Sequence, residues 1–396
     1  MQSSIDILND IRLQLNSLVI FRNLLGAPVI AKLDKLIANI GDPAGAVSSY
    51  AEFVSELYRD YNDFSEYLYD FMLEDDNFYI RAKSNGTEID GVIEKALKNE
   101  LITLQGLSRL RSEDVKKFIG YDGFLPDWNT SDHDFISAYE NRVQTISKRG
   151  FGVFSKYHVF AVSGDRIVPV KYPDPQRLAA LACYERERNL VVENTKALLK
   201  GGEAANVLLY GDAGTGKSST VKAVVNQYKD EGLRLVEVKK NQLRKLPDIL
   251  GQLADNPLKF IIFIDDLSFT ENDDDFSSLK ALLEGGVSAK SGNVAIYATS
   301  NRRHLVKERL SNRDGDDLHV NDTLQDISGL SARFGLTIVF QKPGKDVYLE
   351  IVKHLAADHD IEAGEQLLMN AEAFAVRSGG RSPRAAKQFI SAQLRY

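Results

Sequence analysis

Cysteine is almost absent from this 396-residue sequence, and basic residues are not in excess. The single cysteine, Cys183, excludes an intramolecular disulfide framework and any cysteine-rich zinc site, as is typical of a reducing compartment. Lys and Arg number 49, against 56 Asp and Glu. Because phosphate groups are bound by concentrated basic residues, this balance argues against wholesale coating of nucleic acid or anionic membrane, although it is compatible with a local basic patch.

Long apolar runs are missing as well. No run reaches the ~20 residues that span a bilayer, and the first six residues lack the basic start of a signal peptide. We therefore expect a cytoplasmic protein with no membrane span. The length suffices for two or three domains.

Residues 1–150 are expected to form a mostly helical N-terminal domain. Apolar residues recur at helical spacing between residues 8 and 18, and again, with many aromatics, between residues 53 and 71. Acidic residues are interleaved with the second stripe. One interpretation is a partner-binding helix with an acidic flank. The other, which is the commoner outcome, is an amphipathic helix whose aromatic stripe is core.

A change in residue pattern predicts a short β-hairpin and linker over residues 151–175. Short β-prone runs there are separated by a Ser-Gly-Asp turn at residues 163–165, and Pro-Asp-Pro at residues 173–175 then interrupts the chain. We expect a domain junction in this segment. A helical pattern follows from Leu178 to Leu199.

Residues 206–222 organise the second half of the chain. An apolar run at 207–210 predicts a buried strand, residues 211–218 match the pattern G-x-x-x-x-G-K-[ST] without a mismatch, and a helical pattern follows. In such a loop the backbone N–H groups surround phosphates, Lys217 reaches the β- and γ-phosphates, and the Ser218 hydroxyl ligates magnesium. The expected nucleotide-binding residues are Gly211, Asp212, Ala213, Gly214, Thr215, Gly216, Lys217, Ser218 and Ser219.

Two further strands end in polar residues that suit phosphate chemistry. Five apolar residues precede Asp265 and Asp266, which is typical of a buried parallel strand that delivers acids at its carboxyl end, where α/β sheets bind ligands. Asp265 is the candidate magnesium ligand, and Asp266 is the candidate for orienting or deprotonating the attacking water. Another buried strand ends at Asn301, which can reach toward the γ-phosphate and that water.

The order of these segments resembles that of the AAA+ ATPases over roughly residues 176–396. The segments that carry the resemblance are residues 211–218, 260–266, 299–301, 331–335 and 382–385. More narrowly, residues 264–269, 298–305 and 333–335 are similar to an uncharacterised bacterial AAA+ family described as a domain of unknown function. The resemblance implies an α/β fold, with a three-layer P-loop base and parallel sheet over residues 176–342 and a C-terminal helical lid over residues 343–396.

The resemblance also implies roles for residues outside the loop. Asn301 corresponds to the first sensor, Arg384 to the second sensor, and Arg333 to an arginine finger offered to a neighbouring subunit. The alternatives for the finger are Arg302, Arg303 and Arg309. A finger supplied in trans makes the active site an interface, and a head-to-tail interface produces a ring or an open spiral. We therefore expect a homo-oligomer.

Two departures from the family pattern narrow the function. Many hydrolytic members place Glu where this chain has Asp266, whose carboxylate sits one methylene further back. Slow hydrolysis, or hydrolysis only in an assembled ring, would be consistent with this difference. Residues 239–247 lack the loop of aromatic, hydrophobic and glycine residues that unfoldases use to grip polypeptide. A loader, switch or remodelling role is therefore favoured over threading.

The leading hypothesis is an AAA+ ATPase that hydrolyses ATP with Mg²⁺ and couples nucleotide state to oligomer geometry or partner remodelling. The alternative is an ATP-binding switch or scaffold with negligible hydrolysis that presents its N-terminal domain to a partner. A small-molecule kinase is a third interpretation, less consistent with Asn301, Arg384 and the helical lid. No base-reading or client-gripping motif identifies the client, which is an unknown protein or nucleic acid.

Overall fold

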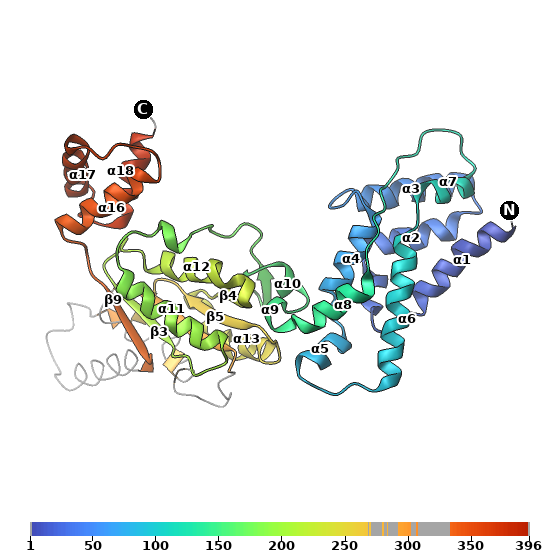
Figure 1. The fold of residues 1–396 in the computed structure, drawn as a ribbon, viewed down its shortest axis with the longest axis horizontal. Coiled ribbons are helices and arrows are strands. Elements are labelled where there is room, and N and C mark those ends of the chain that lie inside the picture. Colours follow the sequence, from blue (N-terminus) through green and yellow to red (C-terminus); the bar gives the residue numbers. More distant parts are fainter. Residues whose placement is uncertain are drawn as a thin grey trace. The chain divides into compact units, whose positions relative to one another are not determined.

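The chain divides into two compact units, Met1–Lys156 and Tyr157–Tyr396. The computed structural model describes residues 2–267, 269–270, 279–280, 283, 292–301, 306–307 and 333–394. Figure 1 labels their helices and some of their strands. Within these residues every helix is too short or too polar to cross a bilayer.

The first unit is helical. Several of its helices begin at an acidic N-cap: Asp42 accepts a hydrogen bond from Gly45 N, and Asp90 accepts one from Val92 N. Such caps satisfy backbone donors that have no partner inside the helix. Its helices are α1 (Gln2–Asn16), α2 (Pro28–Asn39), α3 (Pro43–Leu57), α4 (Phe64–Glu74), α5 (Phe78–Ser84), α6 (Gly91–Ser108), α7 (Ser112–Ile119), α8 (Phe135–Gln144), α9 (Ile146–Arg149) and α10 (Val153–Lys156), with a 3₁₀ turn at Arg22–Gly26.

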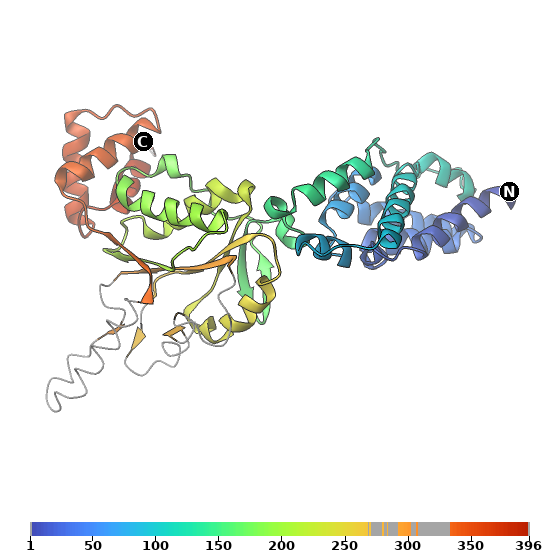
Figure 2. The same cartoon turned by 60° about the horizontal axis from the view of Figure 1, so that its bottom comes forward.

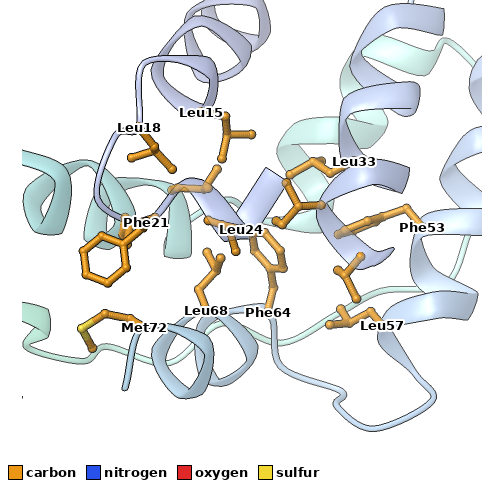
Figure 3. Close-up of a cluster of buried hydrophobic side chains, with 14 of the residues drawn as sticks. Leu15, Leu18, Phe21, Leu24, Leu33, Phe53, Leu57, Phe64, Leu68 and Met72 are labelled. Atoms are coloured by element: carbon orange, nitrogen blue, oxygen red, sulfur yellow. The ribbon is translucent and has the colours of Figure 1, made fainter. Parts of the chain in front are cut away.

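The aromatic stripe of residues 53–71 is divided between two helices. α3 ends at Leu57, and α4 begins at Phe64 after its N-cap Asp63, whose side chain accepts from the backbone N–H groups of residues 65 and 66. Phe53, Leu57 and Phe64 are all at most 1% exposed and lie in one cluster (Figure 3). At these positions the stripe is core, which agrees with the second of the two interpretations.

The second unit contains a mostly parallel sheet. Among the described residues, seven strands have the order β2-β1-β4-β5-β7-β3-β9, and only the β1–β2 pair of these is antiparallel. They are β1 (Val159–Ser163), β2 (Arg166–Pro169), β3 (Val207–Gly211), β4 (Leu233–Glu237), β5 (Lys259–Ile264), β7 (Val294–Ser300) and β9 (Leu336–Phe340). A second pair consists of β6 (Phe269–Thr270) and β8 (Val306–Lys307).

The predicted hairpin is part of this sheet. The sequence predicts a short β-hairpin and linker over residues 151–175, and in the structure β1 pairs both with β2 and, in parallel, with β4, from Val159 opposite Leu235 to Ala161 opposite Glu237. The sheet therefore begins before residue 176. The sequence could not reveal this, because the pairing joins residues about 75 positions apart and leaves no local pattern.

Helices cover both faces of the sheet. In β5, Ile261 and Phe263 belong to one cluster with residues of α11 and α12, and Figure 2 shows these helices on the face opposite α13. Alternate strand residues point to opposite faces, so both faces must be apolar, which explains the unbroken apolar run of β5. These helices are α11 (Glu185–Leu199), α12 (Lys217–Tyr228) and α13 (Leu246–Leu253), with 3₁₀ turns at Leu178–Ala180, Lys229–Glu231 and Lys240–Lys245.

The last three helices form a small bundle around their own core. They are α16 (Lys345–Ala357), α17 (Glu365–Arg377) and α18 (Pro383–Gln393). Tyr348, Ile351, Phe389 and Ile390 are each at most 3% exposed in that core. The predicted fold class is confirmed: a three-layer α/β base with a C-terminal helical lid and a mostly helical N-terminal part.

Candidate nucleotide-binding site

The glycine-rich loop joins β3 to α12 through backbone that only glycine adopts readily. Gly211, Gly214 and Gly216 have φ of +138°, +78° and +95°. The Thr215 hydroxyl closes the turn by donating to the Asp212 carbonyl at 2.8 Å. α12 begins at Lys217, directly after Gly216, so its free N–H groups face the loop. This is the backbone arrangement that binds phosphate.

Gly211 also allows β9 to approach β3. A Cβ added at Gly211 would lie 2.0 Å from the Phe340 carbonyl oxygen. We expect Gly211→Ala to destabilise the protein by about 1 to 3 kcal/mol from backbone strain, with the steric clash in addition. The matched control is Gly251→Ala in α13, where an added Cβ meets nothing within 4 Å. It should stabilise by about 0.5 to 1 kcal/mol. Equal urea midpoints for the two variants would contradict this account.

Lys217 is a nearly buried cation, and its residue is 6% exposed. Its ammonium donates to the carbonyls of Gly211 and Asp212 at 2.9 and 2.7 Å, and to Asn301 Oδ1 at 3.0 Å. Burial lowers the pKa of Lys217, against the opposing effect of nearby carboxylates. Because all three acceptors are neutral oxygens, the site favours an anion beside this ammonium.

The two acids that follow β5 have different partners. Ser218 Oγ donates to Asp265 Oδ1 at 2.6 Å. Asn301 Nδ2 instead donates to Asp266 Oδ1 at 2.7 Å. The Asn301 amide therefore bridges Lys217 and Asp266. A hydroxyl beside a carboxylate supplies the hard oxygen ligands that Mg²⁺ takes together with phosphate oxygens, so Ser218 and Asp265 fit that metal.

Asp266 has a left-handed backbone, with φ of +51°. Its N–H donates to Thr299 Oγ1 at 2.9 Å and to Asp265 Oδ1 at 3.1 Å, which holds this conformation. Asp and Asn enter the left-handed region more easily than other residues with a side chain. The conformation therefore disfavours the Glu that many AAA+ proteins carry here.

The first turn of α18 lies against the glycine-rich loop. Ser382 caps this helix by accepting from Ala385 N at 3.1 Å, and Arg384 N donates to the Gly214 carbonyl at 3.2 Å. A Cβ at Gly214 would lie 3.0 Å from Arg384 Cβ, so it would push this neighbour away, and the φ of +78° also favours glycine. Residues of the loop and of the lid therefore lie side by side in the lining of the site.

A cavity of about 610 Å³ lies between these elements. Besides the loop and the two acids, it is lined by Tyr184 from the start of α11 and by Ile351 from the lid. The Tyr184 hydroxyl donates to the Gln341 carbonyl at 2.6 Å, and its ring stacks on Phe340 at 5.4 Å between centroids. The volume is within the range of small-molecule sites.

Most of the residues predicted for the site line this cavity. Those that do are Gly214, Thr215, Gly216, Lys217, Ser218, Ser219, Asp265, Asp266, Asn301 and Arg384. The predicted residues at 211–213 lead into the loop without lining the cavity. Arg333 precedes β9, and the candidates Arg302, Arg303 and Arg309 lie outside the described residues.

Arg333 lies at the far end of the strand pair from the loop. β9 pairs with β3 from Leu336 opposite Val207 to Phe340 opposite Gly211. Arg333 is therefore three residues before Leu336, where the β3–β9 pair begins, and Gly211 is at the other end of this pair. The four steps from Leu336 to Phe340 span about 13 Å, and Arg333 is not among the residues that line the cavity.

Several polar residues that line the cavity are not among the residues predicted for the site, and three of them are Lys387, Thr299 and His359. Lys387 comes three residues after Arg384 in α18, so spacing on a helix face could have indicated it. Thr299 belongs to a segment that resembled the family, but no role was assigned to it. His359 follows the end of α16 and had no signal in the sequence.

Comparisons with known proteins bear on the family and the fold. The family model described as "Protein of unknown function (DUF815)" matches residues 155–394. Among solved structures, the Thermotoga maritima RuvB Holliday junction branch migration motor aligns at 16% identity with a TM-score of 0.33, covering 55% of this chain and 72% of that chain. A point variant of that RuvB aligns with the same values. No curated protein matches this chain. At such values the likeness to RuvB carries no statement about activity.

Proposed function

Since the chain belongs to the family described as protein of unknown function, DUF815, and has the α/β P-loop fold of the AAA+ class, we propose that it binds ATP with Mg²⁺ and hydrolyses it. The observation that carries the proposal is the set of contacts around one cavity. Ser218 bonds Asp265 at 2.6 Å, while Asn301 joins Lys217 at 3.0 Å to Asp266 at 2.7 Å. Together these groups supply a cation that can bind phosphate, two oxygen ligands for Mg²⁺, and a carboxylate base that is hydrogen-bonded to Asn301.

Each of these groups has a separate task in the proposal. Lys217 and the loop N–H groups neutralise the phosphates, and Ser218 with Asp265 holds Mg²⁺. Asp266, oriented by Asn301, positions the attacking water and accepts its proton. When bound beside Ser218 and Asp265, Mg²⁺ would supply positive charge that offsets the negative charge developing on the phosphate during hydrolysis.

Arg333 is proposed as an arginine finger that acts on a neighbouring copy. Its position three residues before β9, away from the site of its own chain, supports action in trans. Head-to-tail contacts of this kind form a ring or an open spiral. Arg384, on the lid, would respond to the γ-phosphate and so link nucleotide state to the way lid and base are held.

A second candidate is an ATP-binding switch or scaffold with negligible hydrolysis. The left-handed backbone of Asp266 favours it, because that conformation selects the shorter acid in place of Glu. In both candidates residues 176–342 form the nucleotide-binding base, residues 343–396 the lid, and residues 1–150 a mostly helical domain. The second candidate presents that N-terminal domain to a partner, and the client in either case is an unknown protein or nucleic acid. Residues 151–175 connect these parts and add two strands to the sheet. A loader, switch or remodelling role is favoured over threading, because residues 239–247 lack a loop of aromatic, hydrophobic and glycine residues that grips polypeptide.

MgATP is expected to raise the Tm of the wild-type protein. At a ligand concentration of 100 times Kd, binding stabilises by about 2.7 kcal/mol, which corresponds to roughly 5 to 11 °C for a unit of this size. Lys217→Ala should lose most of this shift because it removes the ammonium group that binds the phosphates. Lys222→Ala is the control, since Lys222 lies on the same helix without lining the cavity.

Thermal scans with and without MgATP measure these shifts. No shift in wild type at any MgATP concentration would contradict nucleotide binding. Equal shifts in wild type and Lys217→Ala would contradict the assigned site.

A further inference from the structure

Thr299 lies between the two acids that follow β5. Its hydroxyl donates to Asp265 Oδ1 at 2.5 Å and accepts from the N–H of Asp266 at 2.9 Å. Its carbonyl oxygen accepts from Leu267 N at 2.7 Å. Thr299 itself is 2% exposed and belongs to β7, the neighbour of β5 in the sheet.

These contacts affect the two acids in different ways. The donated bond holds Asp265 Oδ1, the oxygen that also accepts from Ser218. The accepted bond fixes the N–H of Asp266 and thereby its left-handed backbone, from which the Asp266 carboxylate meets Asn301. The Thr299 hydroxyl therefore contacts both neighbouring aspartates, whose carboxylates face different partners. Asp265 faces Ser218, and Asp266 faces Asn301.

Resting on the ATPase function proposed above, we propose that Thr299 is the positioning residue that divides the two acids into a metal ligand and a water-orienting base. The hydroxyl is both donor and acceptor, and no apolar side chain of the same shape can replace it. Partners that orient a metal ligand typically contribute about 10- to 100-fold to metal affinity or activity.

The test compares Thr299→Val, which keeps the shape and removes the hydroxyl, with Thr299→Ser, which keeps the hydroxyl. Binding of a fluorescent ATP analogue is titrated with Mg²⁺ and separately in EDTA, and turnover is measured over the same Mg²⁺ range. We expect Thr299→Val to need about 10- to 100-fold more Mg²⁺ for half-maximal binding and turnover. Its affinity in EDTA and its Tm without nucleotide should match those of wild type. Thr299→Ser should behave as wild type in every assay.

Loss of analogue affinity in EDTA as well as in Mg²⁺ would overturn the proposal, because it indicates a general defect of the site. An unchanged Mg²⁺ requirement in Thr299→Val would overturn it too, while leaving the proposed ATPase intact. If Thr299→Val fails to fold, Thr299→Ala carries the same comparison with Thr299→Ser. A wild-type protein that binds neither ATP nor its analogue overturns the ATPase function, and the positioning role with it.

Discussion

Arg333→Ala is expected to lower ATP turnover by about 10³- to 10⁵-fold, the range measured for arginine fingers. ATP binding should be unchanged, because Arg333 precedes β9 at the end of the strand pair away from the glycine-rich loop. Steady-state turnover and analogue binding are measured over a range of protein concentrations, with light scattering to report mass. In wild type, specific activity should rise with concentration as copies assemble.

Two control variants test whether the loss of turnover is specific to the guanidinium of Arg333. Arg333→Lys keeps the charge but loses the planar fork of donors, so it should recover only part of the activity. Arg166→Ala changes an exposed arginine of the edge strand β2 and should leave turnover unchanged. Full activity in Arg333→Ala would assign the charge compensation to another residue. Turnover that is constant per subunit down to the monomer would contradict a shared active site.

Asp266→Asn is expected to lower turnover by about 10²- to 10⁴-fold, which is the usual contribution of a positioned general base. Asn enters the left-handed backbone region as readily as Asp, so the local fold at φ of +51° should be kept. Asn also cannot accept a proton from water. Affinity for MgATP should therefore stay within a few-fold of wild type while kcat falls.

This substitution separates the two candidate functions. A hydrolytic enzyme loses its turnover in Asp266→Asn, whereas a switch with negligible hydrolysis changes little. Asp255→Asn, at an exposed turn after α13, is the matched control and should have no effect. Turnover that Asp266→Asn leaves unchanged would contradict the assignment of Asp266 as the base.

The glycine-rich loop between β3 and α12 could be predicted because its requirements are local. A strand, a turn with glycine at positions of positive φ, and a helix that begins at Lys217 are all encoded within residues 207–228. The acids were predictable for a similar reason. An apolar strand that ends in carboxylates must present them at the edge of a parallel sheet where ligands bind.

The contacts within the site were not predictable in this way. Lys217 meets Asn301 across 84 residues of sequence, and Ser218 meets Asp265 across 47. Which carboxylate oxygen faces which donor depends on strand order and register, which no local pattern encodes. The same limit explains why the sequence predicts the hairpin of β1 and β2 but not its pairing with β4.

By itself, the sequence determined the class of fold, the glycine-rich loop and the position of the two acids after a buried strand, because backbone propensity, glycine placement and apolar runs act over short distances. Only the tertiary structure decided that Thr299 stands between the acids, that Asn301 bridges Lys217 and Asp266, and that Arg333 lies away from its own loop. The contacts of Thr299 and Asn301 arise where separate strands end side by side. Hydrogen bonds between such ends depend on atomic positions that are set only when the whole sheet has packed.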